Sequence, residues 1–194
     1  VKTGIEVLKA DGFKQLEGKR VGLVTNPTGV DNRLVSDIDI LHHAPNVKLV
    51  ALYGPEHGVR GSAHAGAAVD GNTDTRTGLP VYSLYGKTRV PTDSMLRGID
   101  VLVYDIQDVG CRSFTYISTL YNIMKAAVKH NIKVVVLDRP NPLGGQKIEG
   151  NLVEDDCVSF VSQIKIPYVY GLTPGEVALL LNGENMLGGK CDLT

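Results

Sequence analysis

The stretch VLVYDIQDVGCRS, residues 101–113, runs from an apolar segment into a dense group of polar residues. Its first part, Val101–Ile106, is rich in β-branched residues and has the length of a buried strand. A helical pattern follows over Ser113–Lys129, and Val134–Leu137 is another short β-branched run. A strand, a helix and a second strand in succession are typical of a parallel α/β sheet. This stretch therefore decides the fold class.

The same alternation of apolar runs and helical patterns extends through the rest of the chain and indicates an open, mostly parallel α/β sheet. Near the carboxyl end, Thr173 is suited to cap a helix, and Pro174 fits the first helical position. The further strands predicted are Arg20–Thr25, Val47–Tyr53, Pro80–Leu84 and an edge strand at Gln163–Ile166, and the further helices are Thr3–Lys9, Leu34–His43 and Thr173–Asn182.

Two long loops interrupt this pattern, at Gly54–Gly78 and Asp138–Phe160. Loops of this length are uncommon inside a compact domain and are more often functional than not. The last residues, Lys190–Thr194, resemble the entry to another strand, so we expect the natural protein to continue.

Composition and charge argue against nucleic-acid binding and against a membrane-spanning segment. The 194 residues are enough for one domain with a full core, and the formal net charge is -1. A nucleic-acid-binding domain would be expected to carry a basic face, so nucleic acid is not an expected partner. The apolar runs are far too short to cross a bilayer, and no signal peptide is visible. The three widely spaced cysteines are expected to be free thiols.

Dense polar motifs follow four of the predicted strands. The carboxyl ends of parallel strands lie along one edge of an open sheet, and ligands bind in the crevice outside that edge. Turn chemistry accounts for Pro27, Gly29, Gly110 and Pro142 but leaves the charged residues unexplained. We therefore expect one ligand site, formed by Asn26, Glu56, His57, Arg60, Asp105, Gln107, Asp108, Arg112, Asp138, Arg139 and Asn141.

Several common cofactor signatures are absent from the sequence. The turn after the first strand reads NPTGV, with a single glycine, so neither GxGxxG nor GxxxxGK[ST] is present. A GxSxG nucleophile is absent as well. His57 and His64 lack the HExxH spacing of a zinc site. No cofactor or metal is therefore expected, although a carboxylate-bound Mg²⁺ site built from Asp105, Asp108 and Asp138 stays open.

Carboxylates are the reactive groups that remain in quantity. Glycoside hydrolysis needs one carboxyl that donates a proton to the leaving oxygen and a second group that stabilises or attacks the sugar centre. Glu56 is the best general acid/base candidate, because it follows a strand and nearby glycines let a sugar approach; its alternative role is an ion pair with Arg60 or Arg112. The arginines suit an anionic substrate group. Four tyrosines could stack on a sugar, and we select Tyr116 from Tyr82, Tyr85, Tyr116 and Tyr121.

Seven motifs in order, GLVTNPTGV, GPEHGVRG, TGLPVYSLYG, DIQDVGCRSFTYISTL, DRPNPLGG, IEGN and YGLTPGEVA, cover essentially the whole chain. Together they resemble the exo-β-N-acetylmuramidase family of bacterial glycosidases, long known only as a domain family of unknown function. The resemblance implies that residues 1–194 form one Rossmann-like amino-terminal domain with helices on both faces of its sheet. It also implies a carboxyl-terminal domain in the full-length protein that this chain lacks, with the site in the cleft between the two.

The resemblance further implies release of N-acetylmuramic acid from the non-reducing ends of peptidoglycan fragments. The expected partner is then a muramic-acid glycan. GPEHG carries the glutamate usually proposed as catalytic, here Glu56. A second family glutamate maps to Glu149 in IEGN, or instead to Glu176 in TPGE, where an ordinary helix carboxylate is the alternative. Such a substrate places the protein in the cell envelope, periplasmic or extracellular, with a cytoplasmic recycling role as the alternative.

The lactyl carboxylate of muramic acid would give Arg60, Arg112 or Arg139 a partner. Two other functions compete with the glycosidase. One is a metal-dependent phosphoesterase or phosphotransferase that uses the aspartates named above. The other is a non-catalytic module that binds peptidoglycan or sugar, for which Glu56→Gln would leave turnover unchanged.

Overall fold

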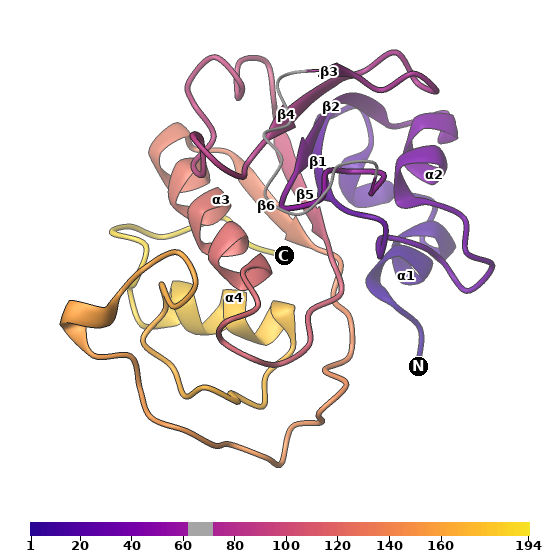
Figure 1. Cartoon of the computed structure of the whole chain (residues 1–194). Coiled ribbons are helices and arrows are strands. Elements are labelled where there is room, and N and C mark those ends of the chain that lie inside the picture. The colour runs from indigo at the N-terminus through magenta and orange to yellow at the C-terminus, as the bar shows by residue number, and fades with distance from the viewer. Residues whose placement is uncertain (62–71) are drawn as a thin grey trace.

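A computed structural model describes residues 1–61 and 72–194 of the chain. Its centre is one six-stranded sheet in the order β3-β4-β2-β1-β5-β6 (Figure 1). Neighbouring strands are parallel except the short β3, which runs antiparallel to β4 at the edge. The strands are β1 (Arg20–Thr25), β2 (Lys48–Gly54), β3 (Asn72–Thr73), β4 (Pro80–Ser83), β5 (Val101–Asp105) and β6 (Lys133–Val136).

The strand order reverses at β1, which lies between β2 and β5. The chain moves outward from β1 through β2 to β4, then returns to the other side of β1 to form β5 and β6. The predicted α/β fold with an open, mostly parallel sheet is confirmed. Ligands of such sheets bind outside the carboxyl ends of the strands where the order reverses. The ends of β1 and β5 therefore mark the region in which a site is expected.

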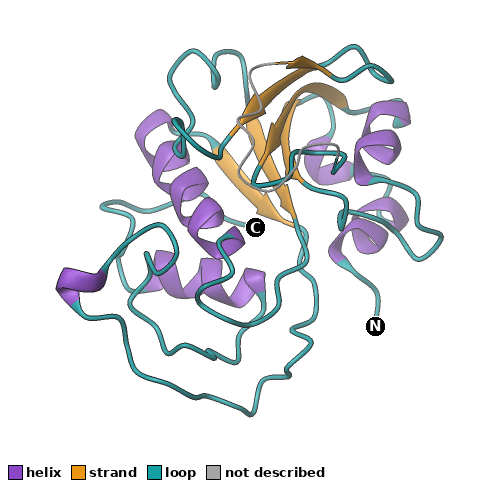
Figure 2. Ribbon diagram, viewed as in Figure 1, coloured by secondary structure: helices purple, strands orange, loops and turns teal. Residues whose placement is uncertain are grey.

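Helices cover both faces of the sheet, with α1 and α2 on one side and α3 and α4 on the other (Figure 2). Among the described residues, no helix is long and apolar enough to cross a membrane. The helices are α1 (Gly4–Ala10), α2 (Asp37–His43), α3 (Tyr116–His130) and α4 (Pro174–Gly183), with short 3-10 turns at Lys14–Leu16 and Asp155–Cys157.

The hydrophobic core has two parts, one on each face of the sheet. Successive side chains of a strand point to opposite faces, so a strand buried on both faces reads as a continuous apolar run. Along β5, Val101 and Val103 pack with the α1 and α2 side, whereas Leu102 and Tyr104 pack with the α3 and α4 side. This double burial explains why the run that opens residues 101–113 contains no polar residue before Asp105.

Two helices begin later than their sequence patterns predict. The helix predicted from Leu34 begins at Asp37, because Leu34 has a left-handed φ of 61° and Ser36 accepts a capping hydrogen bond from the Ile38 amide. The helix predicted from Ser113 begins at Tyr116. At α4 the prediction is confirmed, since Thr173 is the N-cap and Pro174 follows it.

The predicted edge strand at Gln163–Ile166 is wrong. These residues form bends, and the Ile166 amide donates to the Ile164 carbonyl rather than to a neighbouring strand. In the predicted loop over residues 54–78, the central residues 62–71 lie outside the described part, and Asn72–Thr73 adds a short strand. At the other end of the chain, Leu193 forms a parallel bridge with Val134 of β6.

Candidate functional site

The ends of β1 and β5 meet at the reversal of the strand order, where Thr25 pairs in register with Asp105. Asp105 is fully buried, and its carboxylate accepts hydrogen bonds from Arg139 Nε at 2.6 Å and Nη2 at 3.1 Å. Arg139 also donates to the Val30 carbonyl at 3.0 Å and is itself buried. Burial raises the pKa of Asp105, and the guanidinium opposes that shift. Asp105 and Arg139, both predicted to bind a ligand, therefore form a buried ion pair with each other.

A second buried carboxyl, Asp37, lies directly behind this pair. Its Oδ2 is 2.5 Å from the Thr25 hydroxyl oxygen, which is 3.1 Å from the Asp105 carbonyl oxygen. Burial, aided by the charge of Asp105, raises the pKa of Asp37 well above its ordinary value. The Thr25 hydroxyl thus lies within hydrogen-bond distance of both the Asp37 carboxyl and the Asp105 carbonyl, and it joins α2 to the end of β5. A Cβ atom on Gly29 would lie 2.3 Å from Asp37 Oδ2 and 2.3 Å from the Thr25 hydroxyl oxygen, so only glycine fits at this position.

Asp108 follows β5 and is also buried, with 2% of its surface exposed. Its Oδ2 accepts from the Gly110 amide at 2.7 Å and from the Tyr170 hydroxyl. Its Oδ1 is buried and has no hydrogen-bond partner within residues 1–61 and 72–194. Burial raises the pKa of Asp108, while the bonds from Tyr170 and Gly110 act in the opposite direction.

Asp138 follows β6 and caps the start of α4. Its carboxylate accepts from the Thr173 hydroxyl at 2.7 Å and from the Gly175 amide at 2.8 Å. A negative charge at the amino end of a helix is favourable, because it faces the unpaired amides and the positive end of the helix dipole. Asp138 therefore joins the end of β6 to α4, and among the described residues its carboxylate bonds to Thr173 and Gly175 and not to the side chains of the Asp105–Arg139 pair.

The three aspartates considered for Mg²⁺ do not converge on one point. Within the part of the chain that the structure describes, the one group of potential ligands within 4.8 Å of each other is Glu154, Asp156 and Cys157, all exposed on the second 3-10 turn. Asp105 is held by Arg139, and Asp138 by α4. This geometry does not fit the metal-dependent alternative.

Glu56 lies in the turn after β2 and is half-buried. The parallel pairing of β2 with β4 places Gly54 beside Ser83, and the Leu84 amide donates to the Gly54 carbonyl at 2.8 Å. This register brings Tyr85 to the same sheet edge. The hydrogen bond from the Tyr85 phenol to the Glu56 carboxylate, with the charge of that carboxylate, raises the pKa of the phenol.

Tyr116 approaches the same carboxylate from the first residue of α3. Burial raises the pKa of Tyr116, the hydrogen bond with Asn26 opposes that shift, and the charges of Glu56 and Asp108 add to it. The side-chain oxygen of Asn26, Oδ1, accepts hydrogen bonds from the backbone amide of Thr28 at 3.0 Å and from its hydroxyl at 2.5 Å. The side-chain nitrogen of Asn26 is therefore the atom left to donate to Tyr116. The ends of β1, β2 and β5 therefore bring Asn26, Glu56 and Asp108 around Tyr116.

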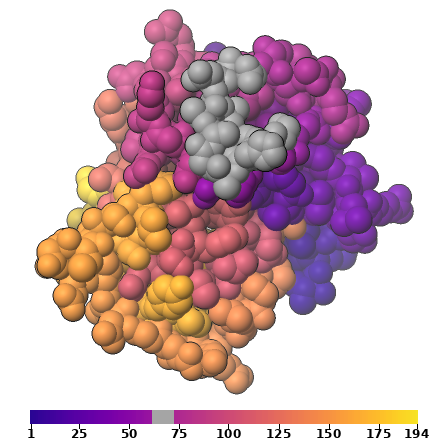
Figure 3. Space-filling view, viewed as in Figure 1, coloured from indigo at the N-terminus to yellow at the C-terminus, as the bar shows by residue number. Residues whose placement is uncertain are grey.

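Two aromatic pairs include the tyrosines whose pKa values Glu56 raises. Phe114 meets Tyr116 edge to face, with ring centroids 4.8 Å apart, and is partly exposed. Tyr85 lies 6.5 Å from Phe160, and the Arg89 guanidinium lies 4.6 Å above the Phe160 ring. In the space-filling view, the loop after β6 (orange) lies beside the region around the start of α3 (rose) (Figure 3). Exposed aromatic rings beside a carboxylate are suited to stack on sugar faces.

His57 and Arg60 continue the turn after Glu56. His57 is exposed and has a left-handed φ of 71°. Arg60 points back to α2 and the β3–β4 segment, where it donates to Asp74 at 2.6 and 3.0 Å and to Asp39 at 3.0 Å. The Arg60 guanidinium lowers the pKa of Asp74 to about 2. Arg60 thus fixes the turn that carries Glu56 and has its charge matched internally.

Gln107 and Asn141 connect the loops that follow β5 and β6. The Gln107 side chain donates to the carbonyls of Asp108 at 2.7 Å and Pro140 at 2.8 Å. Asn141 donates to the Leu172 carbonyl at 3.0 Å and accepts from the Leu143 amide. Both amides therefore hold backbone segments at the predicted edge.

Arg112 anchors the long loop that precedes α4. Its guanidinium donates to the carbonyls of Asn151 at 2.7 Å and Ile166, and to the Ser162 hydroxyl at 3.2 Å. These bonds hold residues 151–166 against the start of α3. The acceptors are neutral, so Arg112 is a cation that orders a loop.

The two glutamates considered as second catalytic groups lie in different settings. Glu149 is exposed, forms an ion pair with Lys147 at 3.2 Å and exchanges backbone hydrogen bonds with Val169. Glu176 accepts from the Thr173 amide at 2.9 Å and completes the capping box of α4. The contacts of the described residues connect neither carboxylate with Glu56.

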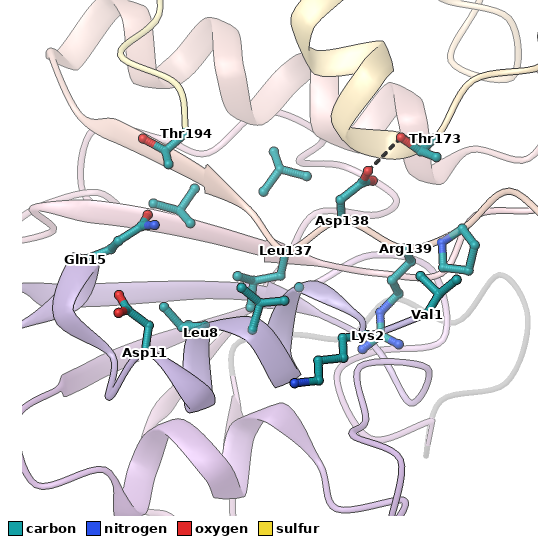
Figure 4. Close-up of a pocket in the computed structure, with 15 residues that line it drawn as sticks. Val1, Lys2, Leu8, Asp11, Gln15, Leu137, Asp138, Arg139, Thr173 and Thr194 are labelled. Carbon is teal, nitrogen blue, oxygen red and sulfur yellow. Dashed lines mark hydrogen bonds between the residues drawn. The ribbon is translucent and has the colours of Figure 1, made fainter.

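A separate pocket of ≈ 520 Å³ lies between α1 and the end of β6 (Figure 4). Asp138 and Arg139 contribute to one wall, and Leu8, Asp11 and Gln15 to the other. In the close-up the Thr173 hydroxyl points to the Asp138 carboxylate across the upper wall. This pocket lies on the α1 side and does not include Glu56 among its lining residues.

The structure thus brings Glu56, Asn26, Asp108 and Tyr116 together and ties the three predicted arginines to internal partners. The sequence did not point to Arg89, Phe114 or Phe160, and Tyr116 was preferred to Tyr85 among the tyrosines. The motif TGLPVYSLYG signalled Tyr85 by its place after β4. Phe160 contacts Arg89 through a cation–π interaction between residues far apart in sequence, so no local sequence pattern could predict it.

Residues 21–194 match the family model described as "Exo-beta-N-acetylmuramidase NamZ, N-terminal". Among curated proteins, the chain is 54% identical over 184 residues to the peptidoglycan beta-N-acetylmuramidase NamZ of Bacillus subtilis (strain 168). That alignment covers 95% of this chain and 44% of the relative.

Solved structures give the same picture. The chain is similar to two DUF1343 family proteins from Bacteroides fragilis NCTC 9343, whose crystal structures it matches over its whole length. One is 70% identical with a TM-score of 0.94, and the other is 36% identical with a TM-score of 0.85. The matches cover 48% and 50% of those chains, so this chain spans about half the length of the relatives it matches.

Proposed function

This chain belongs to the exo-β-N-acetylmuramidase NamZ amino-terminal family, and on that premise we propose that the full natural protein is a glycoside hydrolase acting on peptidoglycan fragments. It releases N-acetylmuramic acid from their non-reducing ends. The identity of 54% to a peptidoglycan β-N-acetylmuramidase over nearly the whole chain supports this assignment. The substrate implies a place in the cell envelope, periplasmic or extracellular.

Glu56 is the general acid/base in this proposal. The observation that carries it is the position of the Glu56 carboxylate, half-buried in the turn beyond the end of β2, where its charge raises the pKa of both Tyr85 and Tyr116. Glycoside hydrolysis requires a carboxyl that gives a proton to the leaving oxygen. Half-burial leaves the carboxylate accessible to a sugar.

The surrounding residues bind and orient the sugar. The Phe114–Tyr116 pair and the Tyr85–Phe160 pair supply aromatic rings for the sugar, and Phe114 is the exposed ring of the first pair, since Tyr116 is buried. Asn26 and Tyr116 supply polar groups at the end of β1 and the start of α3. Glu149 stays a prediction for the second catalytic carboxylate. In the proposal a carboxyl-terminal domain completes the cleft, in line with the greater length of the relatives.

Glu56→Gln in the full natural protein tests the assignment. Turnover of a chromogenic N-acetylmuramide is expected to fall roughly 10²- to 10⁴-fold, the usual contribution of a general acid/base, with binding of N-acetylmuramic acid retained. Unchanged turnover would exclude Glu56 from the chemistry. Binding without turnover in the wild-type protein would favour the non-catalytic sugar-binding module instead.

A further inference from the structure

The proposed substrate is anionic, so its binding site should include a cation that is not already neutralised. Two of the three arginines that the sequence pointed to are neutralised by carboxylates, and the third has its N–H groups occupied by neutral acceptors. Arg60 is paired with Asp39 and Asp74, and Arg139 with the buried Asp105. Arg112 donates to two backbone carbonyls and a serine hydroxyl, and these bonds fix its guanidinium in place.

Arg89 is differently placed. Its side chain is exposed, and ion pairs among the described residues involve Arg20, Arg60, Arg76 and Arg139 but not Arg89. Its backbone carbonyl accepts from the Asn122 amide at 3.2 Å, which ties this loop to α3. The loop that carries the guanidinium is therefore anchored, whereas the charge has no carboxylate partner in residues 1–61 and 72–194.

Phe160 gives the guanidinium a fixed surface. The Arg89 Cζ atom lies 4.6 Å from the Phe160 ring centroid, a distance at which the ring attracts the cation. A guanidinium over a ring keeps the N–H groups at its edge available for a bidentate bond to a carboxylate. The Phe160 loop is held in turn by Arg112 through Ser162.

Tyr85 connects this cation with the candidate catalytic carboxylate. Its ring lies 6.5 Å from Phe160, the ring on which the Arg89 guanidinium rests. The Glu56 carboxylate raises the pKa of the Tyr85 phenol, and the charge of Arg89 opposes that shift.

We infer that Arg89, backed by Phe160, binds the lactyl carboxylate of the muramic-acid unit whose glycosidic bond faces Glu56. This inference rests on the proposed function and adds the residue that selects the acidic sugar. N-acetylglucosamine lacks the lactyl group, so it leaves Arg89 without a partner. The contact therefore discriminates between two sugars that otherwise present the same ring.

The test combines variants with matched ligands in the full natural protein. The aryl β-glycosides of N-acetylmuramic acid, of its lactyl methyl ester and of N-acetylglucosamine share one leaving group and differ at the carboxylate. Arg89→Gln removes the cation, and Arg89→Lys keeps the charge without the bidentate geometry. Lys87→Gln is the control, because Lys87 is an exposed cation in the same loop. The thermal unfolding midpoint of each variant checks that it is folded.

Loss of a hydrogen-bonded charge pair predicts a roughly ten- to hundredfold lower kcat/KM of Arg89→Gln for the acid. The ester and the glucosaminide should be hydrolysed as by wild type, and Lys87→Gln should match wild type on all three. The inference would be overturned if Arg89→Gln lost kcat/KM equally for the three glycosides, or if Lys87→Gln showed the selective loss instead. Neither result would contradict the proposed glycosidase activity.

If the wild-type protein hydrolyses none of the glycosides, the proposed function fails, and binding of free N-acetylmuramic acid decides the Arg89 inference. Weaker binding of the acid but not of its methyl ester by Arg89→Gln, measured by calorimetry, supports it. Equal binding by wild type and Arg89→Gln overturns it.

Discussion

The carboxylate of Glu56 raises the pKa of the Tyr85 phenol, through hydrogen bonding and through its charge, although the two residues lie in different loops. The parallel register of β2 with β4, which pairs Gly54 with Ser83, brings the loops together. The sheet therefore sets the orientation of the candidate catalytic group, and the loop sequences supply only its chemistry.

This relationship predicts the titration of Tyr85. Glu56→Gln removes the negative charge that holds the phenol proton, so the pKa of Tyr85 should fall toward the ordinary value of about 10. The measurement is an NMR titration of ¹³C-labelled tyrosine rings, with Tyr85→Phe to assign the signal. An unchanged Tyr85 titration in Glu56→Gln would show that the two side chains are not in contact in solution.

Tyr116 is expected to contribute to turnover through its hydroxyl. Tyr116→Phe keeps the ring that packs against Phe114 and removes the group beside Asn26 and Glu56. We expect kcat/KM of the full natural protein for a muramide to fall about tenfold, the value of one lost polar contact. Tyr121→Phe is the control, because Tyr121 lies on the same helix and bonds the Met186 carbonyl at 3.2 Å. Equal effects of the two variants would mark a structural role.

Arg139 is expected to act in stability. Arg139→Met leaves the buried Asp105 carboxylate unpaired, and loss of one partner of a buried ion pair costs about 3–5 kcal/mol of unfolding free energy. The double variant with Asp105→Leu removes both charges and should recover much of that loss. Urea unfolding measures both. If the Arg139→Met protein is as stable as wild type and its KM is raised, this account is wrong, and Arg139 binds substrate as the sequence predicted.

Asp37 predicts a pH dependence of stability. Its pKa is raised in the folded protein, so above the unfolded value of about 3.9 the unfolded chain releases a proton that the native protein keeps. Asp37 therefore lowers stability progressively as pH rises toward its folded pKa. Asp37→Asn retains an amide that donates to Thr25 and removes the titration. Its unfolding free energy, measured from pH 4 to 8, should fall less with pH than that of wild type; parallel curves would contradict a protonated Asp37.

The strands and their carboxyl ends were predictable because each buried strand is a continuous β-branched run followed by polar residues. Asp105 and Glu56 were placed at the correct edge for this reason. The roles of the arginines were not predictable, because their partners lie on distant segments. Asp74 meets Arg60 only after β3 pairs with β4, and Phe160 meets Arg89 only once Arg112 has ordered its loop.

The false strand at Gln163–Ile166 has a related cause. Its alternating pattern suits an edge strand, but Arg112 takes the Ile166 carbonyl and the Ile166 amide turns back to Ile164. A tertiary contact thus overrides the local preference. The same limit applies to Glu149, whose sequence motif says nothing about its distance from Glu56.

The central claim is that the Glu56 carboxyl faces the bond that is broken. A crystal structure of the full natural protein with Glu56→Gln and a bound N-acetylmuramide tests this most directly. The account predicts that the side-chain amide of residue 56 lies about 2.6–3.2 Å from the glycosidic oxygen, the reach of a general acid. A ligand whose glycosidic oxygen meets a different carboxyl, with residue 56 turned to solvent, would contradict it.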